Sequence, residues 1–200
     1  MIILGLTGSV GMGKSTTAAM LERAGLPVFD ADAAVHALQA PDGAAIPLLR
    51  AAFPGVVGDD NILDRKALAA RIFADAADKA RLEAIMHPLV ADSRAAFLSA
   101  AKASGAPLVV FDVPLLFETE LDKVCDHTLV VSAPAHIQRE RVLARTGMTE
   151  ALFEKIVAGQ MPDREKRVRA DFVLNSDQPL ADMEAELTTI LERLRPAARA

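Results

Sequence analysis

The fold is decided by the stretch Gly8-Ser9-Val10-Gly11-Met12-Gly13-Lys14-Ser15, which fits the pattern G-x-x-x-x-G-K-[ST] at every fixed position. The apolar run at residues 2–6, just before it, is typical of a buried strand. Residues 14–24 have the composition of a helix, and Gly25 is placed to end that helix. A strand, a glycine-rich turn and a helix in this order predict a phosphate-binding loop rather than a turn without a ligand.

The residues of this loop suit a polyphosphate bound together with a metal ion. Successive backbone N–H groups can surround the phosphates, and the following helix adds partial positive charge at its N-terminus. Lys14 can reach the β and γ phosphates, and Ser15 can ligate Mg²⁺. We therefore expect ATP and Mg²⁺ as ligands, with the side chain of Met12 pointing away from the phosphates. The expected nucleotide-binding residues are Gly8, Gly11, Met12, Gly13, Lys14, Ser15 and Thr16.

Four other short apolar runs predict strands, and the stretches between them have helical composition. The expected strands span residues 27–30, 108–112, 128–131 and 171–174. Short apolar strands separated by helices indicate a parallel sheet that helices cover on both faces, which is an α/β fold.

The stretch from about residue 33 to residue 105 is almost entirely helical in pattern, which suggests an insertion that covers a ligand site. Within it, His87-Pro88 is expected to separate two helices, because Pro88 suits the first turn of the second one. Such a break can aim His87 into a cleft. Elsewhere, Ser132 is expected to cap the helix after the fourth strand. We also expect a last helix at 179–194, with its apolar stripe starting at Leu180, and fraying at 195–200.

Composition bounds the class of protein. The formal net charge is −5, from 22 Lys and Arg against 27 Asp and Glu, which argues against a general nucleic-acid or membrane-surface binder. The single cysteine, Cys125, excludes an intrachain disulfide and a thiolate metal cluster, which fits a reducing compartment. No apolar run reaches the roughly 20 residues of a spanning helix. We therefore expect a cytoplasmic protein that binds no membrane.

Aspartates follow two of the predicted strands, at the end where open α/β sheets bind ligands. Asp30 and Asp32 end the second strand, and in extended chain they would face the same side. Asp112 ends the third strand, the usual place for an acid that orients Mg²⁺ or its waters. Asp32 is our candidate base for the proton of an acceptor hydroxyl. Helix capping is the alternative for both Asp30 and Asp32.

Basic residues gather after the fourth strand. Arg141 and Arg145 are four positions apart and share a helix face, which suits a polyphosphate. A flap that carries such arginines could close over ATP, neutralise charge and exclude water. The alternative is a solvated charged face. The other basic residues of the segment are Arg139, Arg164, Lys166, Arg167 and Arg169.

Taken in order, these residues resemble the dephospho-CoA kinases over nearly the whole chain. The first half of the resemblance rests on Leu6-Thr7-Gly8, Asp30-Ala31-Asp32, His87-Pro88-Leu89-Val90 and Asp112-Val113-Pro114-Leu115-Leu116-Phe117-Glu118. The second half rests on Arg145-Thr146-Gly147-Met148, Gln160-Met161, Lys166-Arg167 and Ala170-Asp171-Phe172-Val173-Leu174-Asn175. Ser9 and Met12 stand where the family commonly has smaller residues, and neither occupies a fixed motif position.

The resemblance implies phosphorylation of the ribose 3′-hydroxyl of dephospho-CoA by ATP, the last step of coenzyme A biosynthesis. It implies a P-loop core like that of nucleoside monophosphate kinases, with a five-stranded parallel sheet, formed by residues 1–32, 105–135 and 165–200. A helical CoA-substrate domain would span 33–104, and a lid 136–164. By the same resemblance, Lys14 and Arg141 would be catalytic with Asp32, and Arg145 would contact the nucleotide. The metal would be held by Ser15 and Asp112, and the acceptor would contact Asp32, His87, Leu115 and Phe117. We expect a monomer or weak homo-oligomer.

Three alternatives differ from this expectation in testable ways. A nucleoside monophosphate kinase would share the architecture, and only the resemblance argues against it. A regulatory GTPase would carry an Asn-Lys-x-Asp motif to read guanine, and the sequence has none. An ATP-binding assembly module would have no use for Asp32 as a base.

Overall fold

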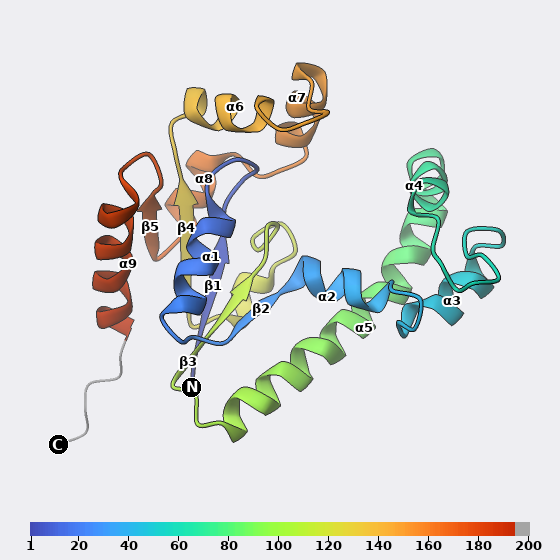
Figure 1. The fold of residues 1–200 in the computed structure, drawn as a ribbon, viewed down its shortest axis with the longest axis horizontal. Coiled ribbons are helices and arrows are strands. Elements are labelled where there is room, and N and C mark those ends of the chain that lie inside the picture. Colours follow the sequence, from blue (N-terminus) through green and yellow to red (C-terminus); the bar gives the residue numbers. More distant parts are fainter. Residues whose placement is uncertain (195–200) are drawn as a thin grey trace. The chain divides into compact units, whose positions relative to one another are not determined.

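The computed structural model describes residues 1–194 and contains a five-stranded sheet (Figure 1). Its strands are β1 (Ile2–Thr7), β2 (Val28–Asp30), β3 (Leu108–Asp112), β4 (His127–Ser132) and β5 (Phe172–Asn175), in the order β2-β3-β1-β4-β5. β1 pairs in parallel with β3 and β4, and β4 pairs in parallel with β5. The expected five-stranded parallel α/β fold is confirmed. The expected fraying of residues 195–200 lies outside the described residues.

Helices α1 (Lys14–Arg23) and α9 (Leu180–Leu194) bury apolar side chains in the same core as the sheet. β3 is buried along its whole length, as expected for a strand covered on both faces. The stripe of α9 has a helical period, and Leu180, where it was expected to start, is 54% exposed. Its buried members are Met183, Leu187, Ile190 and Leu194.

The remaining elements between β3 and β5 are η1 (Leu121–Val124), α6 (Ala135–Leu143), α7 (Glu150–Ala158) and α8 (Asp163–Arg169). In Figure 1, α6 and α7 lie beyond the end of the sheet at which β4 leads into α6. The expected capping of α6 by Ser132 is wrong, because Ser132 still belongs to β4 and Pro134 occupies the N-cap position. None of the helices within residues 1–194 combines the length and the apolar character needed to cross a membrane.

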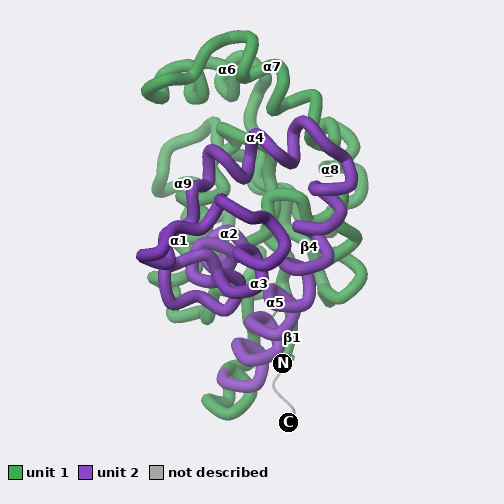
Figure 2. The backbone as a smooth tube through the Cα atoms, turned by 90° about the vertical axis from the view of Figure 1, so that its right-hand side faces the viewer, with its two compact units in different colours: residues 1–29, 101–200 green, residues 30–100 purple. Residues whose placement is uncertain are grey.

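The chain divides into two compact units, coloured separately in Figure 2. The first comprises residues 1–29 and 101–200 and contains nearly all of the sheet; the second comprises residues 30–100. The second unit holds α2 (Ala31–Leu38), α3 (Ala45–Ala52), α4 (Arg65–Ala74) and most of α5 (Ala76–Ala103), and it has a hydrophobic core of its own.

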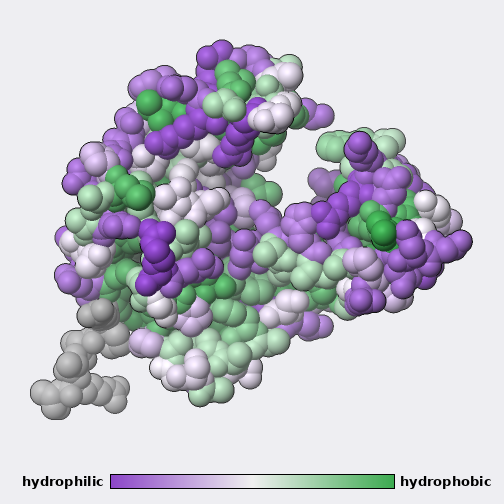
Figure 3. Space-filling model, viewed as in Figure 1, coloured by the Kyte–Doolittle hydropathy of each residue, from purple (hydrophilic) through white to green (hydrophobic). Residues whose placement is uncertain are grey.

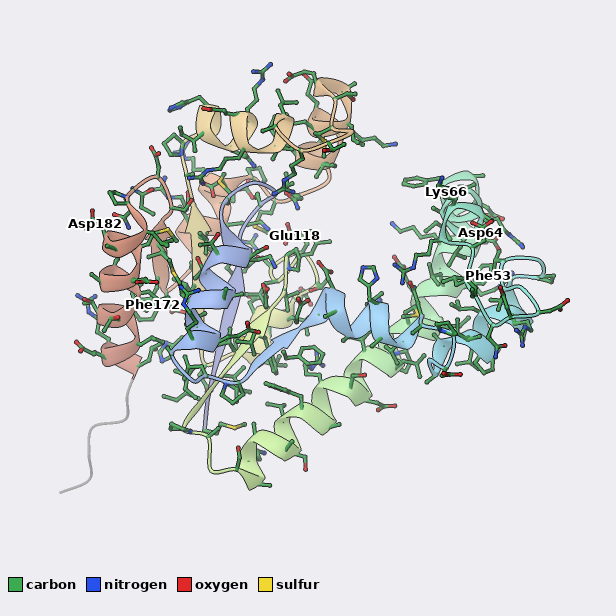
Figure 4. All side chains as sticks on the ribbon, in the orientation of Figure 1. Phe53, Asp64, Lys66, Glu118, Phe172 and Asp182 are labelled. Atoms are coloured by element: carbon green, nitrogen blue, oxygen red, sulfur yellow. The ribbon has the colours of Figure 1, made fainter. Side chains whose placement is uncertain are left out.

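The helix break in the second unit lies elsewhere than expected. α5 continues through His87 and Pro88, so the break expected there is wrong. The chain instead breaks at Asp75, whose backbone is extended and whose Oδ1 accepts a hydrogen bond from Ala77 N at 2.8 Å. Asp64 caps the start of α4 in the same way (Figure 4), so aspartates set the helix starts here. Proline inside α5 is tolerated despite the backbone hydrogen bond that it removes.

Candidate active site

The phosphate loop connects β1 to α1, and its glycines are required by backbone geometry. Gly11 and Gly13 have φ angles of 78° and 90°, in the left-handed region that only glycine adopts readily. A Cβ atom on Gly8 would lie 2.8 Å from the carbonyl oxygen of Val131. The loop therefore lies directly against the end of β4, and its fixed glycines follow from this packing.

The N-terminus of α1 presents polar groups to a ligand. Ser15 and Thr16 are exposed in its first turn, where helical N–H groups have no partners within the helix. The side chain of Met12 is turned inward, as expected, because it is 2% exposed and its Sδ accepts a hydrogen bond from Ala133 N. The N–H of Met12 donates to the carbonyl of Ser9 at 3.1 Å, so in this structure that amide stabilises the loop itself.

Lys14 forms an ion pair with Asp112, and the Nζ–Oδ1 distance is 2.6 Å. The Lys14 side chain is 16% exposed and that of Asp112 is 5% exposed, so the pair is largely shielded from water. Asp112 reaches this position because it ends β3, in register with Leu6 of β1. The structure thus brings together the two residues from which a phosphate-binding cation and a metal ligand were expected.

The arginines of α6 have three different environments. Arg141 donates from both terminal nitrogens to Ser176, at 2.9 Å to Oγ and 2.8 Å to the carbonyl oxygen. Arg139 pairs with Glu150 of α7 through two hydrogen bonds, and this pairing raises the pKa of the guanidinium. Arg145 is exposed, and within residues 1–194 its guanidinium has no hydrogen-bond or ion-pair partner. Hydrophilic residues dominate the surface over α6 and α7 (Figure 3).

A buried lysine is the main feature of this unit that the sequence did not reveal. Lys166 of α8 is 0% exposed, and its Nζ lies 3.0 Å from the carbonyl oxygen of Pro114 and 3.0 Å from Glu118 Oε1. The Pro114 carbonyl also accepts a hydrogen bond from Thr7 Oγ1. Lys166 therefore ties α8 to the loop after β3 and to the end of β1. In the sequence it is one of four basic residues in a row of six, and no local signal separates it from the exposed ones.

Glu118 completes this buried network from the loop between β3 and η1 (Figure 4). Its Oε1 accepts a hydrogen bond from Met161 N at 2.7 Å and also forms the ion pair with Lys166 Nζ. Burial alone would raise the pKa of Glu118, but the hydrogen bonds from Met161 and Lys166 outweigh it and lower the pKa below 4.5. A charged Glu118 is therefore part of the folded structure at neutral pH.

The other residues expected to contact the acceptor from this unit follow Asp112 directly. Leu115 is 38% exposed and has surface to offer to a ligand. Phe117 is 4% exposed and packs in the protein interior, so little of its side chain could reach a substrate.

The second unit carries Asp30, Asp32 and His87. Asp30 caps α2, because its Oδ1 accepts a hydrogen bond from Ala33 N at 2.9 Å. Asp32 lies in the first turn of that helix and is exposed, so the capping alternative applies to Asp30 and not to Asp32. The extended chain on which we based the shared side of the two residues ends at Asp30, because the helix begins at Ala31. His87 is exposed on α5.

Metal binding by protein groups alone is not indicated in the described part of the chain. Residues 1–194 contain no group of three or more His, Cys, Asp or Glu side chains arranged to hold a metal ion.

Known proteins match this chain along most of its length. Residues 2–182 match the family model for dephospho-CoA kinase (CoaE). The dephospho-CoA kinase of Novosphingobium aromaticivorans is 52% identical over 193 residues, which are 96% of this chain and 94% of that protein. The crystal structure of TT1252 from Thermus thermophilus superposes with a TM-score of 0.84 at 37% identity and covers 98% of both chains. Dephospho-CoA kinase from Campylobacter jejuni shares the fold, with a TM-score of 0.64 at 20% identity over 96% of this chain and 97% of that chain.

Proposed function

The chain belongs to the dephospho-CoA kinase family, and on that premise we propose that it transfers the γ-phosphoryl group of ATP to the ribose 3′-hydroxyl of dephospho-CoA. The products are CoA and ADP, and the reaction is the last step of coenzyme A biosynthesis. The observation that carries the proposal is the shielded Lys14–Asp112 pair at a phosphate loop that matches every fixed position of its motif.

The proposed reaction exchanges one bond to phosphorus for another. The 3′-oxygen forms a bond to the γ-phosphorus while the bond from that phosphorus to the β–γ bridging oxygen breaks, which leaves ADP. Asp32 accepts the proton of the 3′-hydroxyl; its exposed position at the start of α2 leaves it accessible to an acceptor. Positioning and neutralisation of charge supply most of the catalysis in such transfers.

Lys14 and Arg141 supply that neutralisation on the nucleotide side. Lys14 exchanges Asp112 for the β and γ phosphates when ATP binds, because a cation already held near the loop needs only a change of partner. Arg141 lies on α6 with its guanidinium on Ser176, and Gly13 of the loop is close to the same residue. Arg145, exposed and four positions later, contacts the nucleotide when the part of the expected lid (residues 136–164) that carries it closes.

Ser15 and Asp112 are the residues that would hold Mg²⁺, together with phosphate oxygens of ATP. Bound there, Mg²⁺ supplies neutralisation of the charge that develops on the phosphate oxygens. His87 and Leu115 are both exposed and are the predicted contacts of the acceptor, whereas Phe117 is buried and packs in the interior. A cytoplasmic location and a monomeric or weakly oligomeric state stay predictions.

The experiment is an acceptor panel. Purified protein is incubated with ATP and Mg²⁺, ADP is followed, and dephospho-CoA is offered against nucleosides, nucleoside monophosphates and no acceptor. We expect ADP formation to depend on dephospho-CoA. Turnover with a nucleoside monophosphate but not with dephospho-CoA would refute the proposed acceptor, and equal ADP formation without any acceptor would indicate an ATPase.

A further inference from the structure

Two glutamines hold the backbone of Val10 within the phosphate loop from both sides. Gln160 Oε1 accepts a hydrogen bond from Val10 N at 3.0 Å, and Gln138 Nε2 donates to the Val10 carbonyl oxygen at 2.8 Å. The two amide orientations follow from chemistry, because a backbone N–H can only donate and a carbonyl oxygen can only accept. The N–H and C=O groups of one loop residue are therefore both satisfied by side chains from outside the loop.

The loop also lies directly against α6, the helix that carries Gln138. A Cβ atom on Gly11 would lie 2.5 Å from Val142 Cγ2 and 2.9 Å from the carbonyl oxygen of Gln138. The Gln138 side chain belongs to a residue that is only 7% exposed, so its hydrogen bond to Val10 is shielded from water. A shielded hydrogen bond is costly to leave unmade, so this contact fixes the loop strongly.

The segment that follows Gln160 is anchored at several points. The next residue, Met161, donates its N–H to Glu118, and Asp163 accepts a hydrogen bond from Ser132 Oγ at 2.8 Å. Lys166 continues the series with its bonds to Pro114 and Glu118. These contacts join the segment to the loop after β3 and to the end of β4, so Gln160 presents its carbonyl group from a rigid base.

We propose that Gln138 and Gln160 are positioning residues that hold the Val10 peptide groups and keep the phosphate loop in its binding shape before ATP arrives. Preorganisation of this kind raises affinity, because the ligand no longer has to order the loop. The inference rests on the proposed function in naming ATP as the ligand. It also limits any lid motion: a segment that moves relative to the loop must hinge between Val142 and Gln160, because both ends are attached to the loop.

The test uses the same substitution at both positions. Gln138→Glu and Gln160→Glu each add one negative charge beside the same residue. At position 160 the carboxylate still accepts from the Val10 N–H, whereas at position 138 it faces the Val10 carbonyl and the hydrogen bond is lost. We expect Gln138→Glu to weaken ATP binding, measured by calorimetry, about ten-fold or more beyond Gln160→Glu. Equal losses of ATP affinity in the two variants would overturn the inference.

A third variant removes the contact without adding charge. Gln160→Leu should raise the KM for ATP by several-fold while kcat at saturating ATP and the KM for dephospho-CoA change little. Thermal unfolding identifies any variant that is misfolded, and Gln160, which is only partly buried, is the safer position. A folded Gln160→Leu protein with the ATP affinity of the parent contradicts the inference. Because calorimetry with ATP needs no acceptor, this test stands even if dephospho-CoA proves to be the wrong acceptor.

Discussion

Asp32 and His87 of the helical unit differ in their surroundings from several polar residues of the phosphate-loop unit. Around the loop they are paired: Lys14 with Asp112, Lys166 with Glu118, Arg141 with Ser176. In the helical unit, the two residues expected to act on the acceptor, Asp32 and His87, are exposed at helix surfaces. Substitution of one of these paired residues should therefore change the stability of the fold, whereas substitution of Asp32 or His87 should change activity and leave stability nearly unchanged. Substitutions can test this difference by measuring stability and activity side by side.

The largest effect should come from Asp32→Asn, which tests whether activity can be lost in the helical unit without a loss of stability. Loss of the base should lower kcat by roughly 10²–10⁴-fold. The free energy of unfolding and the affinity for ATP should stay near those of the parent, because Asp32 is exposed and Asp30 makes the helix cap. Steady-state kinetics and urea unfolding of the same preparation provide the measurement. Turnover within a few-fold of the parent would exclude Asp32 as the base.

Lys166→Met tests whether a paired residue of the phosphate-loop unit is needed for stability. Removing one partner of a buried ion pair leaves Glu118 without its counter-charge, so the free energy of unfolding should fall by about 3–5 kcal/mol. The matched control is Arg167→Met on the same helix, an exposed residue whose loss should cost no more than about 0.5 kcal/mol. Equal urea midpoints for the two variants would show that the buried pair does not hold this unit together.

Glu118→Gln should have a smaller and pH-dependent effect, because glutamine keeps an acceptor for Met161 N. The pKa of Glu118 is lower in the folded state than in the unfolded chain. Its charge therefore stabilises the fold above the unfolded pKa of about 4.5, and that stabilisation is lost as the pH falls through the lower folded pKa. The stability deficit of the variant should be largest near pH 7 and should shrink in acid. A deficit that is constant across this range would contradict the assigned charge.

The smallest effects concern the helix break in the second unit. Asp75→Ala removes the side chain that caps α5 and should cost about 1 kcal/mol of stability. Pro88→Ala should act in the opposite direction, because it gives the interior of α5 a backbone donor. If Pro88→Ala destabilises the protein and Asp75→Ala does not, the helix cap at Asp75 does not contribute to the stability of this unit.

The sequence was sufficient where local patterns decide the structure. The strands, the loop and the helix after it follow from apolar runs, glycines and the phosphate motif, each of which is contained in a short stretch of sequence. The break at Asp75 could have been predicted, because Asp75-Ala76-Ala77-Asp78 resembles a helix-capping signal. We gave more weight to Pro88 and placed the break there.

Other features could not be predicted, because their partners are remote in sequence. Gln160 and Gln138 contact Val10 across 150 and 128 positions, and Lys166 reaches Pro114 across 52. A glutamine or a lysine on a helix has the same local pattern whether it is buried in such a contact or solvated. Only the folded chain distinguishes the two cases.

The central claim concerns one hydroxyl group, and the structure of the product tests it most directly. The protein is incubated with ATP, Mg²⁺ and dephospho-CoA, and the product is isolated and examined by mass spectrometry and phosphorus NMR. We expect a single added phosphoryl group, coupled to the proton on the ribose 3′-carbon. A phosphoryl group at any other position, or unchanged dephospho-CoA in the presence of an active ATP-bound protein, would contradict the account.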